Sequence, residues 1–392
     1  MDRVTGTLRL SPLETVISGP GRISALGAEV ASRNLTRVLV VTGRTLGASP
    51  LIDKVTGSLG ERCAGVFNGI GEHAPAANVR ALLEEVRRAK VDALVSFGGG
   101  SVADAVKIAV ASVLADRDLT REATKVSYND TEISPNGRLL ANIVVPTTLS
   151  AGEYSFGAAT TDDQGRKGSI IDPRIGAVVA IHDAELTLAT PDRLWLSSGI
   201  KCLDHTVEAI YSAHSDSLTD ALASNALRLL LEHLPLSTTT EGGARLAHRT
   251  HCQTAAFMSN YAAFNTRYGL SHATGHKIGP RWHVPHGITS CISLPSGMRF
   301  MAEVAAQRFG LLADVLGVDS SLNERDRAYA CADHVEQFIT GLGLPTRLRE
   351  FNVDKAELND VVPALYDQMS LAGTIGRPVT MDEMRGVVHA CW

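Results

Sequence analysis

The stretch Val91-Asp-Ala-Leu-Val-Ser-Phe97, followed at once by Gly98-Gly-Gly-Ser101, decides the fold of this chain. Its first part is a short apolar run typical of a buried strand, and residues 102–113 after the glycines have a helical pattern. Glycines in such a turn let backbone amides approach an anion with no Cβ in the way, and the helix N-terminus adds a favourable field. We therefore expect a phosphate-binding turn here; a tight turn without a ligand is the alternative.

The same alternation of strand and helix patterns runs through the first half of the chain. Further buried-strand runs lie at 37–42, 142–148 and 176–182, and a helical spacing of apolar residues lies at 78–90. Alternation of this kind favours a parallel sheet with helices on its faces. We predict an α/β domain over residues 1–187, interrupted by a polar inserted loop at 119–138.

The second half of the chain has a different pattern. Pro191-Asp-Arg predicts the start of a helix, and long patterns of period 3.6 follow, while strand patterns nearly disappear. The clearest of these patterns lie at 217–233, 244–264 and 302–316. We therefore predict an all-α domain over residues 188–392, with the active-site cleft between the two domains.

Composition excludes several classes of protein. The 392 residues are 44% hydrophobic and 20% charged, with a net charge of −5 and no basic block, which disfavours nucleic acid as a partner. No apolar run reaches the ~18 residues of a membrane span, and no signal-peptide pattern is apparent. The six cysteines are scattered, which is typical of reduced thiols in a cytoplasmic protein.

Histidines in the second half are the strongest indication of chemistry. His272 and His276 are four residues apart, so on a helix they share one face. Pro285 ends any helix, so the chain can fold back and bring His286 to the same place, and His205 lies in an earlier helical stretch. Because the chain has 13 histidines, a close pair can also be purely structural. Converging imidazoles indicate a metal, proton transfer, or both.

Two other segments carry polar side chains at informative positions. Lys201 and His205 are four apart on the predicted helix and share a face, while Asp204 lies about 100° further round. Alternatively, Lys201 can pair with Asp204 at i, i+3, and both charges then have a purely structural role. The loop after the strand at 142–148 offers hydroxyls that can bond a nucleotide, or can simply end the strand. These hydroxyls belong to Thr147, Thr148 and Ser150.

Together these motifs make the chain resemble the iron-containing alcohol dehydrogenase family along nearly its whole length. The motifs are Gly-Gly-Gly-Ser at 98–101 with Asp104 and Lys107, Pro-Thr-Thr at 146–148, Leu-Thr-Leu-Ala-Thr-Pro191, His205-x-x-Glu208-Ala, and Gly-Leu-Ser-His272-x-x-x-His276 through Pro285-His286-Gly287. Glu72-His73-Ala-Pro75 and Gly376-Arg-Pro-Val-Thr380 are similar to its maleylacetate reductase branch.

This resemblance implies a fold, a reaction and an assembly. The expected fold is an N-terminal dinucleotide-binding α/β domain followed by an all-α domain, as in iron-containing alcohol dehydrogenases and dehydroquinate synthases. The expected reaction is hydride transfer with NADH or NADPH to or from a small molecule, on CH–OH, C=O or C=C. The resemblance also implies a homodimer, and its reductase branch implies a role in aromatic catabolism.

The resemblance fails at the metal site. Metal-dependent members bind Fe²⁺ or Zn²⁺ through an Asp and three His, which by position would be His205, His272 and His286. The Asp position, four residues before His205, is Lys201 here, and an ammonium has no lone pair for a metal. The maleylacetate reductase branch also lacks this Asp, typically with Asn in its place. We favour a metal-free protein, with three His holding Zn²⁺ as the alternative.

We therefore hypothesise that Lys201 supplies the positive charge that a metal supplies elsewhere in the family. A cation aimed at the substrate oxygen stabilises the negative charge that builds there during hydride transfer. His205 and His272 could assist, and His276 matches the non-ligand His that the family places near the nicotinamide, as a proton relay or positioning residue.

The cofactor-binding residues follow from the motifs and the resemblance. Thr42-Gly43-Arg44 after the first predicted strand lacks the acid that NAD-preferring dehydrogenases place there, so NADPH is acceptable and NADH remains open. The candidate cofactor-binding set is Gly43, Arg44, Gly98, Gly99, Gly100, Ser101, Asp104, Thr147, Thr148 and Ser150.

The sequence thus predicts an NAD(P)H-dependent reductase of a keto group on a small substrate, in the manner of maleylacetate reductase. Arg281 and Arg267 could face a carboxylated substrate, although most arginines lie on the surface. The alternatives are a metal-dependent NAD(P) alcohol dehydrogenase, a lyase like dehydroquinate synthase, and a catalytically silent homologue.

Overall fold

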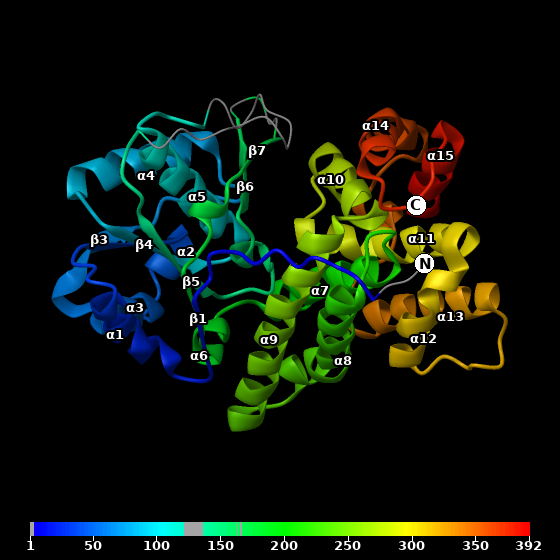
Figure 1. The fold of residues 1–392 in the computed structure, drawn as a ribbon, viewed down its shortest axis with the longest axis horizontal. Helices are drawn as coiled ribbons and strands as arrows, with labels where there is room; N and C mark the ends of the chain where they lie inside the picture. The colour runs from blue at the N-terminus through cyan, green and yellow to red at the C-terminus, as the bar shows by residue number, and fades with distance from the viewer. Residues whose placement is uncertain (1–3, 121–135, 163, 165–166) are drawn as a thin grey trace. The chain divides into compact units, whose positions relative to one another are not determined.

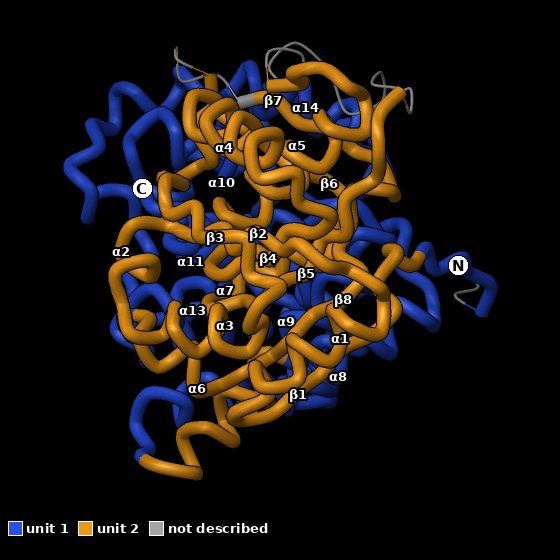
Figure 2. Tube along the Cα trace, turned by 90° about the vertical axis from the view of Figure 1, so that its left-hand side faces the viewer, with its two compact units in different colours: residues 1–9, 191–241, 254–392 blue, residues 10–190, 242–253 orange. Residues whose placement is uncertain are grey.

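A computed structural model describes residues 4–120, 136–162, 164 and 167–392, so most of the predicted inserted loop at 119–138 lies outside the described residues (Figure 1). The chain divides into two compact units, coloured separately in Figure 2. The sheet unit comprises residues 10–190 and 242–253, and the helical unit comprises residues 191–241 and 254–392 together with the chain before residue 10.

This division differs from the predicted domains in three places. The prediction separated the domains between residues 187 and 188, whereas the compact units separate after Thr190. Residues up to Arg9 group with the helical unit, where the backbone N–H of Arg9 donates to Asn265. Residues 242–253 group with the sheet unit, where the buried Arg249 donates to the carbonyl of Thr187. Sequence periodicity cannot reveal such exchanges, because each depends on contacts between distant segments.

The sheet unit is built on a parallel sheet. Within the described residues, six strands lie in the order β1-β8-β5-β4-β2-β3, and every neighbouring pair is parallel. These strands are β1 (Thr15–Ser18), β2 (Val38–Val41), β3 (Cys63–Phe67), β4 (Ala93–Gly98), β5 (Ala141–Pro146) and β8 (Val179–His182). An antiparallel hairpin, β6 (Gly157–Thr161) and β7 (Lys167–Ile171), stands beside it. The parallel α/β expectation is confirmed.

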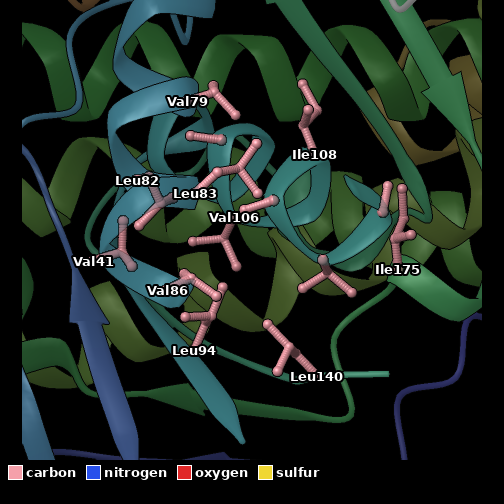
Figure 3. Packing of buried hydrophobic residues seen from close by; sticks show 14 of the residues in the cluster. Val41, Val79, Leu82, Leu83, Val86, Leu94, Val106, Ile108, Leu140 and Ile175 are labelled. Atoms are coloured by element: carbon pink, nitrogen blue, oxygen red, sulfur yellow. The ribbon is translucent and has the colours of Figure 1, made fainter. Parts of the chain in front are cut away.

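Alternate residues of the central strands enter two separate cores. Leu39 and Val41 of β2 pack with α4 and α5 in one core, part of which Figure 3 shows. Val38 and Val40 of the same strand pack in the other core, with residues of α1 and α3. Successive side chains of a strand point to opposite faces, so a wholly apolar strand such as β2 requires helices on both sides of the sheet.

The helices of the sheet unit cover these two faces. Their bounds are α1 (Leu26–Ser32), α2 (Arg44–Gly47), α3 (Leu51–Leu59), α4 (Ala76–Ala89), α5 (Gly100–Ala115) and α6 (Ala184–Thr187). The predicted helices at 78–90 and 102–113 correspond to α4 and α5, each of which starts two residues earlier than expected. Helix α5 therefore begins at Gly100, within the glycine turn.

The helical unit contains the longer helices of the chain. Their bounds are α7 (Asp192–Tyr211), α8 (Ser217–Thr239), α9 (Gly242–Thr266), α10 (Leu270–Trp282), α11 (His286–Ala305), α12 (Gly310–Leu316), α13 (Glu324–Gly341), α14 (Val362–Ala372) and α15 (Met381–Ala390). Helix α9 changes from the sheet unit to the helical unit after Gln253. The expectation of one helix over 302–316 is wrong, because α11 ends at Ala305 and a 3₁₀ turn (Ala306–Phe309) separates it from α12.

Helix α7 is the centre of the helical unit. It is buried from Trp195 to Tyr211 and contacts α8, α10 and α11. The indole N–H of Trp195 donates to the hydroxyl of Ser237 on α8 at 2.8 Å, which satisfies the one polar group of that fully buried side chain. A helix buried on all sides is a rigid support for polar side chains.

No helix of the described residues is long and apolar enough to cross a membrane.

Candidate active site

Three helices of the helical unit carry the candidate catalytic residues. Lys201 and His205 lie one turn apart on α7, and His272 and His276 lie one turn apart on α10. Pro285, expected to end a helix, instead caps the N-terminus of α11, of which His286 is the first residue. Helix α10 ends earlier, at Trp282, where His283 adopts a left-handed conformation that turns the chain.

The central contact of this group joins Lys201 to His272. The Nζ atom of Lys201 lies 3.0 Å from Nδ1 of His272, and both side chains are buried. An ammonium only donates hydrogen bonds, so Nδ1 must be the acceptor, and the proton of a neutral His272 ring must then sit on Nε2. This contact therefore sets the tautomer of His272.

The other imidazoles gather around His272. Its ring centroid lies 5.5 Å from that of His205, 4.3 Å from that of His276 and 6.2 Å from that of His286. His276 and His286 stack with their centroids 5.5 Å apart. The structure thus brings together all four histidines that the sequence singled out, and adds Lys201 to them.

Burial decides the charge of the two inner histidines. Loss of water, followed by the charge of Lys201, lowers the pKa of both His205 and His272 well below its ordinary value of 6.5. Both rings are therefore neutral at pH 7, which agrees with His272 accepting a hydrogen bond. In the described part of the chain neither ring nitrogen of His205 has a hydrogen-bond partner, so this buried ring can still bind a ligand.

Two buried carboxyl groups on α7 connect this helix to the other helices of the site. Oδ2 of Asp204 accepts a hydrogen bond of 2.6 Å from the hydroxyl of Ser290 on α11. Burial raises the pKa of Asp204 to about 6, and the nearby charge of Lys201 opposes the rise. Asp204 thus links α7 to α11.

Glu208 holds the start of α10. Its carboxylate accepts hydrogen bonds from the backbone N–H of Gly269 at 2.9 Å and of Ser271 at 2.7 Å, and a longer one from His272. An acid at a helix N-terminus satisfies otherwise unpaired N–H groups and complements the helix dipole. The sequence analysis found Glu208 only as part of a family motif, because its partners lie on another helix.

An aromatic side chain that no sequence motif indicated also belongs to the site. Tyr268, the second residue before α10, stacks on His272 with a centroid distance of 4.1 Å and an angle of 13° between the ring planes. Its centroid is also 5.3 Å from that of His205. Its position four residues before His272 was the available signal, but the spacing predicts contact only if the helix continues through residue 268.

The sheet unit brings two predicted cofactor-binding segments together. The backbone N–H of Thr147 donates to the carbonyl of Gly98 at 3.0 Å. A Cβ on Gly99 would lie 3.1 Å from Oγ1 of Thr148, and one on Gly100 would lie 3.1 Å from Oγ of Ser150. Glycine at these positions therefore allows hydroxyls to lie against the turn, beside the first N–H groups of α5.

The remaining candidate cofactor residues lie around this turn and after β2. Ser101 accepts a hydrogen bond from the backbone N–H of His73, and Asp104 lies half-buried one turn into α5. Gly43 precedes the short helix α2, whose first residue, Arg44, is exposed.

The two candidate substrate arginines have other partners. Arg281 bonds the exposed acids Glu357 and Asp360, which agrees with the surface position that the sequence left open for it. Arg267 donates to the backbone carbonyl of Ala372. Both sit at helix ends, where sequence alone does not show which way a long side chain turns.

Comparison with known protein families decides the identity of this architecture. The profile described as iron-containing alcohol dehydrogenase matches residues 14–184, and the profile described as Fe-containing alcohol dehydrogenase family, C-terminal, matches residues 195–392. The chain belongs to the iron-containing alcohol dehydrogenase family. It is an NAD-dependent oxidoreductase that acts on CH–OH or C=O groups, as the sequence resemblance predicted.

Individual members of the family are distant relatives. Lactaldehyde reductase of Escherichia coli is 26% identical and covers 97% of this chain and 98% of its own length. A structure of 1,3-propanediol oxidoreductase has a TM-score of 0.89 at 24% identity, covering 99% of this chain and 100% of that one. Maleylacetate reductase from Agrobacterium tumefaciens has a TM-score of 0.78 at 23% identity, covering 98% and 97%. These two structures establish the fold.

The metal site of the family can now be tested against the side chains present. A family member that binds a metal through one Asp and three His needs a side chain with a lone pair at residue 201. Here that residue is a lysine, and its ammonium contacts His272. A protonated Nε2 on His272 has no lone pair to offer a metal. No group of three or more His, Cys, Asp or Glu among the described residues is arranged to hold a metal ion. These donors do not fit the four-ligand site of the family.

Proposed function

We propose that this chain is an NAD(P)H-dependent reductase of a small carbonyl compound in which Lys201 is the electrophilic group. The observation that carries the proposal is the contact between Lys201 and His272, because it directs a buried ammonium into the histidine cluster. Oxo acids such as maleylacetate are the first substrates to test, since a cationic site favours an anionic ligand.

In this reaction a hydride leaves C4 of the reduced nicotinamide and adds to the carbonyl carbon. The electron pair of the C=O π bond moves to oxygen, which then takes one proton, so that ketone, NAD(P)H and H⁺ give alcohol and NAD(P)⁺. Negative charge grows on the oxygen as the hydride arrives. Donors already directed at that oxygen stabilise the transition state without reorganisation.

Lys201 and the histidines have different roles in stabilising the oxygen and supplying its proton. The Lys201 ammonium has three protons, of which one bonds His272 and another can bond the substrate oxygen. Neutral His205 has unpartnered ring nitrogens and can hold the same oxygen or a water molecule. His276 is only half-buried and contacts His272, so it can return a proton from solvent to the buried pair.

We propose that the glycine turn binds the phosphates of the cofactor and that Gly43-Arg44 contacts its adenosine ribose. The hydroxyls of Thr148 and Ser150 lie against the turn and can donate to phosphate oxygens. Without an acid after β2, a ribose 2′-phosphate meets no repulsion, and the exposed Arg44 can attract it. In this proposal NADPH is therefore accepted beside NADH.

One experiment tests the proposal as a whole. Rates of NADPH and NADH oxidation on maleylacetate and on lactaldehyde are measured before and after EDTA treatment, with metal content determined in parallel. Activity that survives EDTA in protein with far less than one metal per chain supports Lys201 as electrophile. One metal per chain with activity lost to EDTA supports the alternative, a metal-dependent alcohol dehydrogenase. Size-exclusion chromatography of the same sample tests the expected homodimer.

A further inference from the structure

The turn before α10 is constrained at three consecutive residues. Arg267 has φ +62° and ψ 151°, an unfavourable backbone conformation for a residue with a Cβ, and its side chain is bonded to the carbonyl of Ala372. The next residue, Tyr268, is the one that stacks on His272. Strained backbone persists where surrounding contacts hold it in place, and such positions gather at functional sites.

A side chain on the residue after Tyr268 would displace Glu208. A Cβ on Gly269 would lie 2.6 Å from a carboxylate oxygen of Glu208, the same carboxylate that accepts the Gly269 N–H. A larger residue would push this acid away from the start of α10. Glu208 on one side and the Arg267 side chain on the other thus set the direction of Tyr268.

In this position the Tyr268 ring contacts the two buried histidines, His205 and His272. The Tyr268 ring lies nearly parallel to His272, and the edge of His276 meets the same imidazole at 61°. His272 is therefore held by one ring face, by one ring edge and by the hydrogen bond to Lys201. Tyr268 itself is half-buried, whereas Lys201 and His272 are buried.

We propose that Tyr268 is a positioning residue whose ring, rather than its hydroxyl, holds His272 with Nδ1 facing Lys201. This inference rests on the proposed function, because it assumes that the Lys201–His272 pair carries out the chemistry. A misplacement of about 1 Å at a reacting group can lower a rate about 100-fold. Loss of the stacking ring should therefore affect turnover more than substrate binding.

The test uses two substitutions of the full-length protein. Tyr268→Phe keeps the ring and should keep kcat within about twofold, whereas Tyr268→Leu should lower kcat at least about tenfold with a smaller change in KM. Tyr366→Leu, which removes another half-buried tyrosine of the helical unit, should leave kcat near the wild-type value. If Tyr268→Phe loses as much activity as Tyr268→Leu, the hydroxyl is the essential group and the proposal is overturned.

A measurement independent of turnover separates this inference from the proposed function. Nitrogen-15 spectra of the histidine rings in the cofactor-free protein distinguish a bare from a protonated Nδ1, with the His272 signals assigned from a His272→Gln variant. Wild type and Tyr268→Phe should show a bare Nδ1 on His272, and Tyr268→Leu should show a mixture of tautomers. An unchanged spectrum in Tyr268→Leu overturns the inference even if the protein proves to be a reductase.

Discussion

Nζ of Lys201 and Nδ1 of His272 lie 3.0 Å apart, although 71 residues separate them in the chain. The contact ties α7 to α10 and makes a buried lysine the donor at the centre of a histidine cluster. In a family whose metal-dependent members place an aspartate at this position, the sign of the charge is reversed.

Lys201→Met should lower kcat by about 100- to 1,000-fold, the usual effect of removing one donor from an oxyanion site, with KM changed only a few-fold. Steady-state kinetics with the best carbonyl substrate checks this. Lys277→Met, on α10 but with its charge near Asp367, is the matched control and should remain active. A Lys201→Met enzyme with near-wild-type kcat would falsify the electrophilic role.

Lys201→Asp should create a metal site. The substitution removes the ammonium and adds a carboxylate one turn before His205, where metal-dependent members of the family have theirs. We expect about one Fe²⁺ or Zn²⁺ per chain after reconstitution, and much less in the wild type treated identically. Elemental analysis of both proteins measures this, and equal metal contents would show that Lys201 does not control metal binding.

Gly43→Asp should shift cofactor preference from NADPH towards NADH. Two unit charges a few ångströms apart near a protein surface repel by about 1–4 kcal/mol, so KM for NADPH should rise at least about tenfold. KM for NADH should change much less, since its ribose carries no phosphate. Arg44→Gln should weaken NADPH alone, and a Gly43→Asp protein with unchanged NADPH kinetics would place the 2′-phosphate elsewhere.

Glu208→Gln should destabilise the helical unit by about 2 kcal/mol. The carboxyl oxygens of Glu208 accept backbone hydrogen bonds at the start of α10, while burial raises the pKa of this carboxyl well above its usual value. Glutamine replaces one acceptor oxygen by an NH₂ group, and leaving a buried backbone N–H without its acceptor costs about 1–3 kcal/mol. The midpoint of urea unfolding reports the loss, and Glu84→Gln on the exposed face of α4 is the control. Equal midpoints for the two variants would mean that Glu208 does not stabilise the start of α10.

Stability should fall with acid because of His182 in the sheet unit. Burial lowers the pKa of His182 to about 4, while in the unfolded chain it is near 6.5. Between these values only the unfolded state takes up a proton, so the free energy of unfolding decreases as pH falls from 6.5 to 4, and levels off below. The difference corresponds to about 3 kcal/mol.

This pH dependence can be assigned to one side chain. Urea unfolding at pH 7 and pH 4.5 should show a smaller acid-induced loss in His182→Gln than in the wild type. His182→Gln should also be less stable at pH 7, because Nε2 of His182 hydrogen-bonds the Tyr154 hydroxyl at 2.8 Å. The exposed His334→Gln should leave the pH dependence unchanged. A wild-type slope retained in His182→Gln would assign the effect to other groups.

Much of the sheet unit could be predicted from local patterns. The apolar runs that become β2, β4, β5 and β8 lie inside the sheet, where both faces are covered and most residues are apolar. The strands that the patterns missed in this sheet, β1 and β3, lie at its two edges. An edge strand can be half-exposed, as the alternating burial of β1 shows, and four such residues do not stand out from a loop.

By itself the sequence determined the alternation of strands and helices, the glycine turn, the family and the lysine at the metal position, because each is a local pattern of residue types. Only the tertiary structure decided that Lys201 meets His272, that His286 begins a separate helix, and that Tyr268 lies on an imidazole. The reason is physical: helical periodicity tells which residues share a face, whereas the packing of helices distant in sequence decides what that face meets.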